Sequence, residues 1–252
     1  NIAGTDTLRL STSKTPFGTG CLTGDAEVLT RNGWRRLDSL SGPIEVLEWR
    51  SGEATLDFAI GVPTRERTPP YMMEATTEQF YTQVTPNHRI YSTHPSHGSW
   101  SILPASELSK RRYMKIPISA RYIGGASTFS AARLLSAVLA DGSYEGNHAR
   151  IMFKKQRKIN RFLDLLTHYN IKWSEHSARE GYRRFYFHRP ADWPKIKAWG
   201  PWILDLTQET LDELVDEARY WDSTERGASF TFFTASREQA DWFSIAAHLT
   251  AR

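Results

Sequence analysis

The chain has almost no cysteine and no long apolar runs. Cys21 is the only cysteine in 252 residues, so an internal disulfide is excluded. No apolar run approaches the roughly 20 residues that a membrane-spanning helix needs, and the first residues do not have the pattern of a signal peptide. These absences predict a protein of the reducing cytoplasm, in which Cys21 stays a free thiol.

A large excess of charge of one sign is also missing. The formal net charge is +4, with 40% hydrophobic and 24% charged residues. This composition excludes a low-complexity polymer and predicts a globular chain that is long enough for two domains. The slightly basic balance permits nucleic-acid binding without requiring it.

The single thiol directly follows a glycine, in residues 20–30, which read GCLTGDAEVLT. A glycine carbonyl is unhindered, so the Cys21 sulfur is a candidate to attack the Gly20 carbonyl and move the acyl group from nitrogen to sulfur. Residues 85–88 read TPNH, and His88 is a candidate acid for the leaving amine. On these residues alone the alternative stays open, because a lone cysteine is often a small buried hydrophobe.

These two segments resemble, in their order and spacing, the first two blocks of inteins, the self-splicing Hint domains. The resemblance implies an all-β, horseshoe-like Hint module over residues 21–120. It also implies an N–S acyl shift at Gly20-Cys21, with Thr85 and His88 activating the scissile peptide and no cofactor for splicing.

Short alternating segments separated by turns fill the same region. Strands are expected at residues 26–30, 44–49, 58–62, 72–75, 80–84 and 89–92, with a hairpin at Asn32-Gly33 and single helical turns at 37–40 and 105–108. The pattern predicts an all-β module. Residues 121–128 are the expected linker to a second domain.

After the linker the apolar residues follow a helical period. Helices are expected at residues 131–140, 158–169, 208–221 and 238–249, and strands at 150–153, 171–174, 182–188 and 229–234. The order helix, strands, helix occurs twice, which predicts a pseudo-symmetric pair of α/β halves. The chain as a whole is expected to be α+β.

The first of these helices has a small-residue edge. Residues 134–142 read LLSAVLADG, in which Ser136 and Ala140 permit close approach of a second helix. The segment resembles the signature of LAGLIDADG homing endonucleases. That resemblance implies an αββαββα domain with a pseudo-twofold repeat over residues 129–252, incomplete at its C-terminal end. A plain buried helix is the alternative.

The same resemblance implies a second active centre. Asp141 ends the first motif, and Asp222 ends a second, weaker motif whose helix spans residues 211–221. The two residues are expected to bind Mg²⁺ and to cleave double-stranded DNA of the intein-less host gene. The second motif departs from the family pattern, since Glu217 stands where a small residue is usual and Ser223 stands where glycine is usual.

Two basic clusters accompany the nuclease-like motifs. Because cationic side chains neutralise phosphates, we expect these clusters to bind DNA, although such a run is commonly only a solvated surface. The candidate residues are Lys154, Lys155, Arg157, Lys158 and Arg161 in the first cluster and Arg183, Arg184 and Arg189 in the second.

The two ends of the sequence suggest a fragment of an interrupted gene. Residues 3–13 read AGTDTLRLSTS and resemble family A (Pol I type) DNA polymerases. Residues 1–20 are therefore expected to be an N-extein segment, in a bacterial or phage-infected cell. Inteins end in His-Asn before Ser, Thr or Cys, whereas this sequence ends in HLTAR. We therefore expect an N-terminal intein fragment, from a truncated gene or a split intein with a separate C-terminal fragment as its partner.

Three functions remain open on the sequence. The first is a splicing element with an active homing endonuclease, and the second is a Hint domain with a degenerate, inactive nuclease insert. The third is a DNA-binding protein without catalysis, in which Cys21 is incidental.

Overall fold

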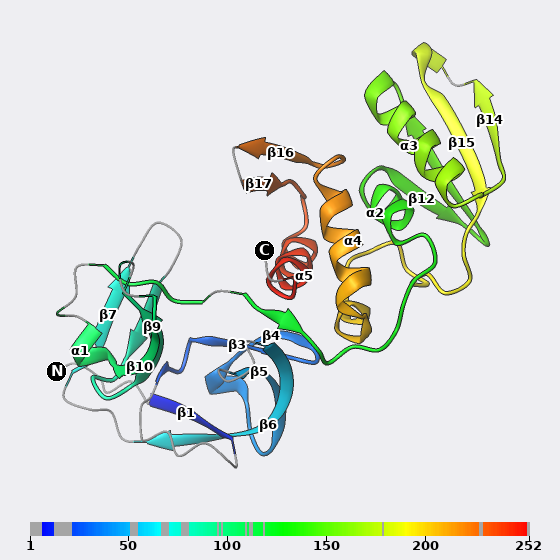
Figure 1. Cartoon of the computed structure of the whole chain (residues 1–252). Coiled ribbons are helices and arrows are strands. Elements are labelled where there is room, and N and C mark those ends of the chain that lie inside the picture. Colours follow the sequence, from blue (N-terminus) through cyan, green and yellow to red (C-terminus); the bar gives the residue numbers. More distant parts are fainter. Residues whose placement is uncertain are drawn as a thin grey trace. The chain divides into compact units, whose positions relative to one another are not determined.

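The computed structural model describes residues 7–12, 22–50, 55–66, 71–76, 81–94, 96, 98–108, 110, 113–117, 119–177, 179–226 and 229–250. The chain divides into two compact units, Asn1–Ala120 and Arg121–Arg252, and their elements are labelled in Figure 1. Strands dominate the first unit and the second mixes helices with strands, so the expected α+β class is confirmed.

The first unit is built from short strands and two helical turns. One sheet has the strand order β4-β3-β5-β6-β1-β2-β8-β7, and β9 and β10 form a separate antiparallel pair. The elements are β1 (Thr7–Thr12), β2 (Leu22–Thr23), β3 (Glu27–Thr30), β4 (Gly33–Arg36), the 3₁₀ turn η1 (Leu37–Ser39), β5 (Ile44–Arg50), β6 (Thr55–Glu66), β7 (Met73–Thr76), β8 (Tyr81–Val84), β9 (Arg89–Thr93), β10 (Trp100–Pro104) and α1 (Ala105–Leu108).

The predicted hairpin and helical turns of this unit are confirmed. Strands β3 and β4 pair with Thr30 opposite Gly33, and Gly33 has a φ of 86°, which glycine adopts without strain. Thr30 stabilises the turn, because its Oγ1 donates to the Gly33 carbonyl at 2.9 Å and accepts from the Asn32 amide at 3.1 Å. The turn at η1 buries Leu37 in a small apolar core.

No strand was expected within residues 1–20, but residues 7–12 form one. These residues form β1, in which Leu8 lies opposite Arg65 of β6 and opposite Leu22 of β2. The segment reads TLRLST, and this short apolar–polar alternation fits a strand of period two. Strands β4 and β10 were also not predicted.

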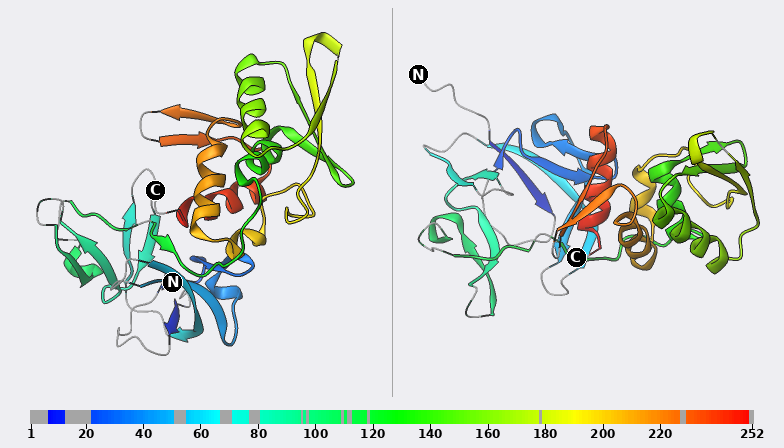
Figure 2. Two further views of the ribbon diagram at one scale, coloured as in Figure 1. Left: turned by 45° about the vertical axis from the view of Figure 1, so that its right-hand side comes forward. Right: turned by 90° about the horizontal axis from the view of Figure 1, so that it is seen from above.

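The second unit alternates helices with strand pairs, and Figure 2 shows it from two further sides. Its elements are β11 (Arg121–Tyr122), α2 (Ala132–Asp141), β12 (Gly142–Glu145), β13 (His148–Phe153), α3 (Gln156–His168), β14 (Trp173–Ser177), η2 (Arg179–Gly181), β15 (Arg183–His188), η3 (Pro201–Asp205), α4 (Gln208–Ala218), β16 (Ser223–Arg226), β17 (Ser229–Phe232) and α5 (Arg237–His248).

The order of these elements agrees with the prediction from α2 to α4. Apart from the 3₁₀ turns, it runs helix, two strands, helix, two strands, helix. A second run, from α4 through β16 and β17 to α5, repeats the helix–strands–helix order. Among the described residues no strand pair follows α5, so the second run is shorter than the first.

One part of the core of the second unit lies between α3 and a four-stranded sheet of order β12-β13-β15-β14. The amphipathic face predicted for α3 is confirmed, since Phe162, Leu165 and Leu166 are buried. The Phe162 ring lies 5.4 Å from Phe153 of β13 and 5.4 Å from Phe185 of β15, measured between ring centroids. Alternate strand residues therefore face the helix and the opposite side of the sheet.

The expected linker, residues 121–128, contacts the second unit closely. Tyr122 is buried, its hydroxyl donates to the Leu204 carbonyl at 2.6 Å, and its amide donates to Gln208 Oε1 at 2.6 Å. Ser127 also bridges Leu206 in parallel fashion. These hydrogen bonds fix the segment against η3 and the start of α4.

Within the part of the chain that the structure describes, no helix combines the length and the apolar character needed to cross a membrane.

Candidate functional site

Helices α2 and α4 pack against each other through a small residue. Ser136 is only 2% exposed, and its Oγ donates to the Leu214 carbonyl of α4 at 3.0 Å. A hydroxyl-to-backbone bond of this kind requires close approach of the two helices. The small-residue edge predicted from the sequence is thus at a helix contact.

This packing brings Asp141 and Asp222 to one place. Asp141 is the last residue of α2, and Asp222 follows α4 by a short turn. Lys158 of α3 forms an ion pair with Asp141 and lies 3.7 Å from Asp222, measured from Nζ to Oδ1. The two carboxylates therefore share one ammonium group.

A second lysine, Lys197, lies beside the same carboxylates. Its Nζ lies 3.5 Å from the Ala140 carbonyl. Burial lowers the pKa of Lys197, while Asp222 and Asp141 oppose that shift. Sequence reasoning missed this residue, because it lies in the irregular segment between β15 and η3 and belongs to no motif.

The charge balance of this carboxylate site, Asp141 with Asp222, favours added positive charge. Burial raises the pKa of Asp222, and the neighbouring Asp141 raises it further, despite the opposing effects of Lys158 and Lys197. The raised pKa means that ionised Asp222 is less favourable here than in water. A cation placed between the carboxylates relieves that cost.

A hollow of about 520 Å³ opens next to Asp222 and Lys197. Its wall also includes Trp199, Phe233 and Gln239. The Gln239 amide is fixed, because its Oε1 accepts from the Trp199 amide at 2.7 Å and its Nε2 donates to the Trp199 carbonyl at 3.1 Å. The hollow thus combines an aromatic wall with groups able to hold an anion near the carboxylates.

The residues present are compatible with Mg²⁺. In proteins this ion is commonly held by one or two carboxylates, with water and substrate phosphate oxygens filling the other positions. Asp141 and Asp222 supply two carboxylates. Among the described residues no group of three or more His, Cys, Asp or Glu side chains is arranged to hold a metal ion, so the donor set is limited to this pair.

The pKa shift of Asp222 leads to a stability prediction. Its folded-state pKa lies above the unfolded value, so the folded protein binds the extra proton and loses stability as the pH rises through the folded pKa. Asp222→Asn should therefore raise the unfolding temperature at pH 7. The gain should disappear below about pH 4, near the pKa of an unperturbed Asp.

Thermal unfolding of Asp222→Asn and its parent at pH 7 and pH 3.5 measures this effect. Asp164→Asn, at an exposed position of α3, is the matched control and should leave the unfolding temperature unchanged. A lower unfolding temperature for Asp222→Asn at pH 7 contradicts the prediction.

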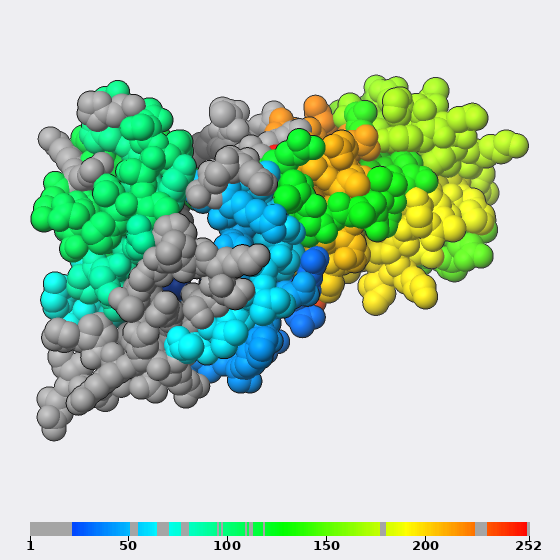
Figure 3. All heavy atoms as spheres, turned by 60° about the horizontal axis from the view of Figure 1, so that its bottom comes forward, coloured from blue at the N-terminus to red at the C-terminus, as the bar shows by residue number. Residues whose placement is uncertain are grey.

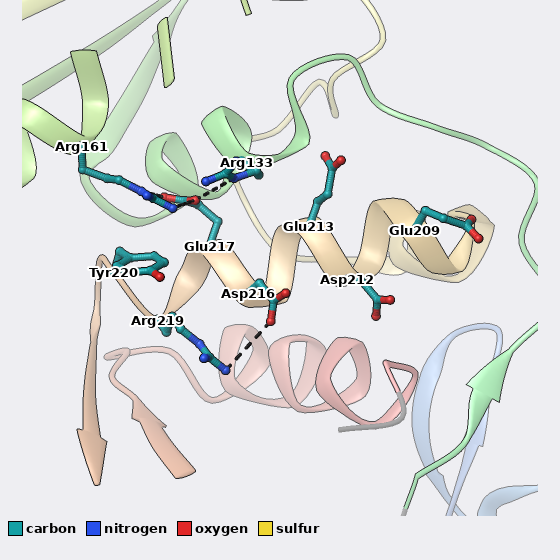
Figure 4. A pocket seen from close by; sticks show the side chains of 9 residues that line it. All are labelled: Arg133, Arg161, Glu209, Asp212, Glu213, Asp216, Glu217, Arg219 and Tyr220. Carbon is teal, nitrogen blue, oxygen red and sulfur yellow. Dashed lines mark hydrogen bonds and ion pairs between the residues drawn. The ribbon is translucent and has the colours of Figure 1, made fainter. Parts of the chain in front are cut away.

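Glu217, the residue that departs from the family pattern, is a buried charge. It is 1% exposed and points toward Arg133 and Arg161, as Figure 4 shows. Glu217 Oε2 accepts from Arg133 Nε at 3.0 Å and Arg161 Nη2 at 2.6 Å, and Oε1 accepts from Arg161 Nε at 2.9 Å and Trp221 Nε1 at 3.1 Å. One carboxylate thereby connects α2, α3 and the end of α4.

Several of the predicted DNA-binding residues are engaged within the protein. Arg183 binds Glu175 through two hydrogen bonds of 2.5 and 2.8 Å. Arg189 donates to the Pro194 carbonyl at 3.0 Å and lies over the Tyr144 ring. Arg161 is held by Glu217, and Lys158 by the carboxylate site.

The remaining predicted residues lie nearer to solvent. Lys154, Lys155 and Arg157 are exposed around the start of α3. Arg157 makes only a long contact of 3.4 Å to the Tyr220 carbonyl, and Lys154 lies 5.6 Å from the centroid of the Tyr182 ring. Arg184 lies on the face of the sheet opposite to α3, with Met152 and His176 as its strand neighbours.

The first unit holds the other predicted centre. Thr85 is 3% exposed, and its carbonyl accepts from the His88 amide at 2.9 Å in a tight turn after β8. His88 is half-buried and lines a hollow of about 270 Å³ together with Trp49 and Tyr91. The His88 carbonyl accepts from the Ala105 amide at 2.8 Å, which ties the turn to α1.

Cys21 and Gly20 lie outside the described residues. The described residue that follows Cys21 is Leu22, and it lies opposite Val84, the residue before Thr85. Strand β2 therefore begins next to the Thr85–His88 turn.

The chain was compared with protein-family models and with curated proteins. No family model matches the chain, and no curated protein matches it.

Proposed function

We propose that the second unit is a Mg²⁺-dependent, LAGLIDADG-type DNA endonuclease and that the first unit is an N-terminal part of an intein Hint domain. The observation that carries the nuclease proposal is the meeting of Asp141 and Asp222 at the ends of packed helices. These two residues come from the two motif-like segments, about eighty positions apart in the sequence.

Asp141 and Asp222 hold the metal in this proposal. Bound there, Mg²⁺ supplies a water of lowered pKa and stabilises charge on the leaving oxygen of a phosphodiester. Lys197 and Lys158 balance the phosphate charge beside the carboxylates. Lys197 is suited to this role, because its lowered pKa reflects the cost of a buried ammonium that a phosphate offsets.

The DNA surface in this proposal is the face of the sheet opposite to α3. Arg150, Arg184 and Tyr186 project from neighbouring positions of β13 and β15 on that face. Side chains on β-strands can contact base edges in the grooves of B-DNA. Lys154, Lys155 and Arg157 extend the cationic surface from the start of α3.

This surface leads to a prediction on salt dependence. Replacing Lys154, Lys155 and Arg157 together by Gln should weaken binding to all duplex sequences. It should also flatten the slope of log affinity against log salt by about 3, since each phosphate contact contributes about 0.9. Gel-shift titrations at several salt concentrations measure the slope.

Lys172→Gln, at an exposed position before β14, serves as the control and should keep the parental slope within about one unit. If the triple variant and its parent have equal slopes, Lys154, Lys155 and Arg157 do not contact DNA phosphates.

Splicing chemistry in the first unit follows from Cys21, Thr85 and His88. The Cys21 sulfur attacks the Gly20 carbonyl, the C–N bond breaks as the C–S bond forms, and His88 protonates the leaving amine. Thr85 orients the scissile peptide. Support comes from the Thr85–His88 turn, in which Thr85 is buried, and from the pairing of Leu22 with Val84.

Release of residues 1–20 tests this part of the proposal. Dithiothreitol should release the segment from the parent and not from Cys21→Ala. Mass spectrometry of the released segment and of the remaining chain measures this. Because β1 is paired with β2 and β6, release also requires that strand to separate from the sheet, so mild denaturant should accelerate it. Release from Cys21→Ala at the parental rate refutes the assignment.

The proposal assigns residues 1–20 to a polymerase extein and leaves the later splicing steps to a C-terminal intein fragment. The second candidate is a Hint domain with an inactive nuclease, which the departures of Glu217 and Ser223 from the family pattern favour. A plasmid-nicking assay with and without Mg²⁺ decides between them. Metal-dependent nicking supports the active enzyme, and DNA binding without nicking supports the degenerate one or a non-catalytic DNA-binding protein.

A further inference from the structure

Histidines gather on the face of the β12-β13-β15-β14 sheet that does not face α3. On β13 and β15 the residues alternate, so that buried Ala149 and Phe187 face the helix layer while His148 and His188 face away. In Figure 3 the yellow atoms, which the bar assigns to β15 and the segment after it, are visible at the surface of the second unit. Both histidines are exposed.

The two histidines are directly opposite each other in the ladder. His148 pairs with His188, and the Arg189 amide donates to the Asn147 carbonyl at 2.9 Å just beyond them. In an antiparallel ladder hydrogen-bonded and non-hydrogen-bonded pairs alternate, so His148 and His188 form a non-hydrogen-bonded pair, in which side chains lie closest. Their ring centroids are 5.4 Å apart, at an interplanar angle of 67°.

One of the rings has a contact that suits a metal ligand. His188 Nδ1 lies 3.1 Å from the Arg189 carbonyl oxygen. A carbonyl oxygen only accepts hydrogen bonds, so the ring donates through Nδ1, and in the neutral imidazole Nε2 is then the nitrogen that can bind a metal. Histidines that bind metals commonly donate their other nitrogen in this way to a carbonyl or carboxylate.

We propose that His148 and His188 form a two-imidazole site for a divalent transition-metal ion of the Zn²⁺, Ni²⁺ or Cu²⁺ type. Imidazole nitrogen suits these ions, whereas Mg²⁺ prefers oxygen ligands. The two rings supply two ligands and water supplies the others. This site is separate from Asp141 and Asp222 and does not depend on the proposed function.

The charged neighbours on the same face leave the site with two protein ligands. Glu145 lies opposite His148 on β12, but its carboxylate pairs with Arg150 at 2.7 Å. Arg150 lies opposite Tyr186, one step along the same face. Metal bound at the histidines therefore adds positive charge to a face that already carries Arg150 and Arg184.

Calorimetric titration of the untagged full chain with ZnCl₂ and with NiCl₂ tests the site, in a Cys21→Ala background that removes the competing thiol. With Asp141→Asn added to this background, which removes the proposed carboxylate site, we expect binding of one ion per chain. His148→Ala and His188→Ala should each weaken it by about a hundredfold, because the second imidazole acts at high effective concentration. Excess MgCl₂ should not compete.

His176→Ala is the matched control, since His176 lies on the same face in β14, opposite Arg184. It should keep the parental affinity, and so should Asp141→Asn, which separates this site from the carboxylates. Circular dichroism checks that each variant stays folded. Parental affinity in His148→Ala or in His188→Ala, or a hundredfold loss in His176→Ala, overturns the proposal.

Discussion

Asp141→Asn is expected to lower the rate of Mg²⁺-dependent plasmid nicking by about a thousandfold. A metal ion supplies several kcal/mol of transition-state stabilisation, and each ~1.4 kcal/mol corresponds to a factor of ten in rate. Asn keeps the size of the side chain and removes the charge that balances both the metal and Lys158. The loss should appear in the rate at saturating DNA rather than in DNA affinity, since the variant keeps the cationic residues that we propose to bind DNA.

The rate is measured by supercoiled-plasmid relaxation at several Mg²⁺ concentrations. Asp164→Asn makes the same chemical change at an exposed position of α3 and should leave nicking unchanged. If Asp141→Asn nicks at the parental rate, the carboxylates are not the metal site. If neither protein nicks while both bind DNA, the degenerate nuclease is the better description.

The residues of this centre differ in how far the sequence reveals them. Asp141 and Asp222 were predicted together because each stands at a fixed place in a motif, one at the end of a helix and the other after one. Lys158 was predicted as a phosphate contact, yet it bridges both carboxylates, because the rotation of α3 about its axis is set by tertiary packing. Lys197 has no local signal at all, since only burial beside Asp222 distinguishes it from other lysines.

The fold was predictable where one period dominates a long segment. The helices α2, α3 and α5 were found within a few residues of their bounds, because their apolar residues recur at helical spacing. Strands β12 and β16 were missed, since each spans four residues directly after a helix or its turn. Such short strands depend on their partners β13 and β17 rather than on their own sequence.

Glu217 shows the limit of comparison with a motif. A large acidic side chain in place of a small one would by itself oppose close packing of α2 and α4, but the charge of Glu217 is compensated. Arg133 and Arg161 come from two other helices, so the sequence of α4 alone does not predict that they pair with Glu217. The buried Glu217 is therefore compatible with close packing of α2 and α4 through Ser136.

Glu217→Ala is therefore expected to destabilise the second unit by about 3–5 kcal/mol, the usual cost of removing one partner from a buried ion pair. The variant leaves Arg133 and Arg161 without their carboxylate, and Trp221 Nε1 loses its acceptor. Hydrogen exchange of the α2 and α4 amides in the full chain reports on this unit directly. Glu213→Ala, at an exposed position one turn earlier on α4, should change protection by less than about 0.5 kcal/mol.

A compensated variant separates the lost charge pairing from the lost side-chain volume. Replacing Arg133 and Arg161 by Met and Glu217 by Leu removes all three charges and fills the space with apolar groups. Such replacements are often neutral or stabilising, because the cost of burying charge disappears with the charge. We expect amide protection in the triple variant to return to the parental level or above it. Equal protection in Glu217→Ala and Glu213→Ala would mean that the buried carboxylate does not hold the three helices together.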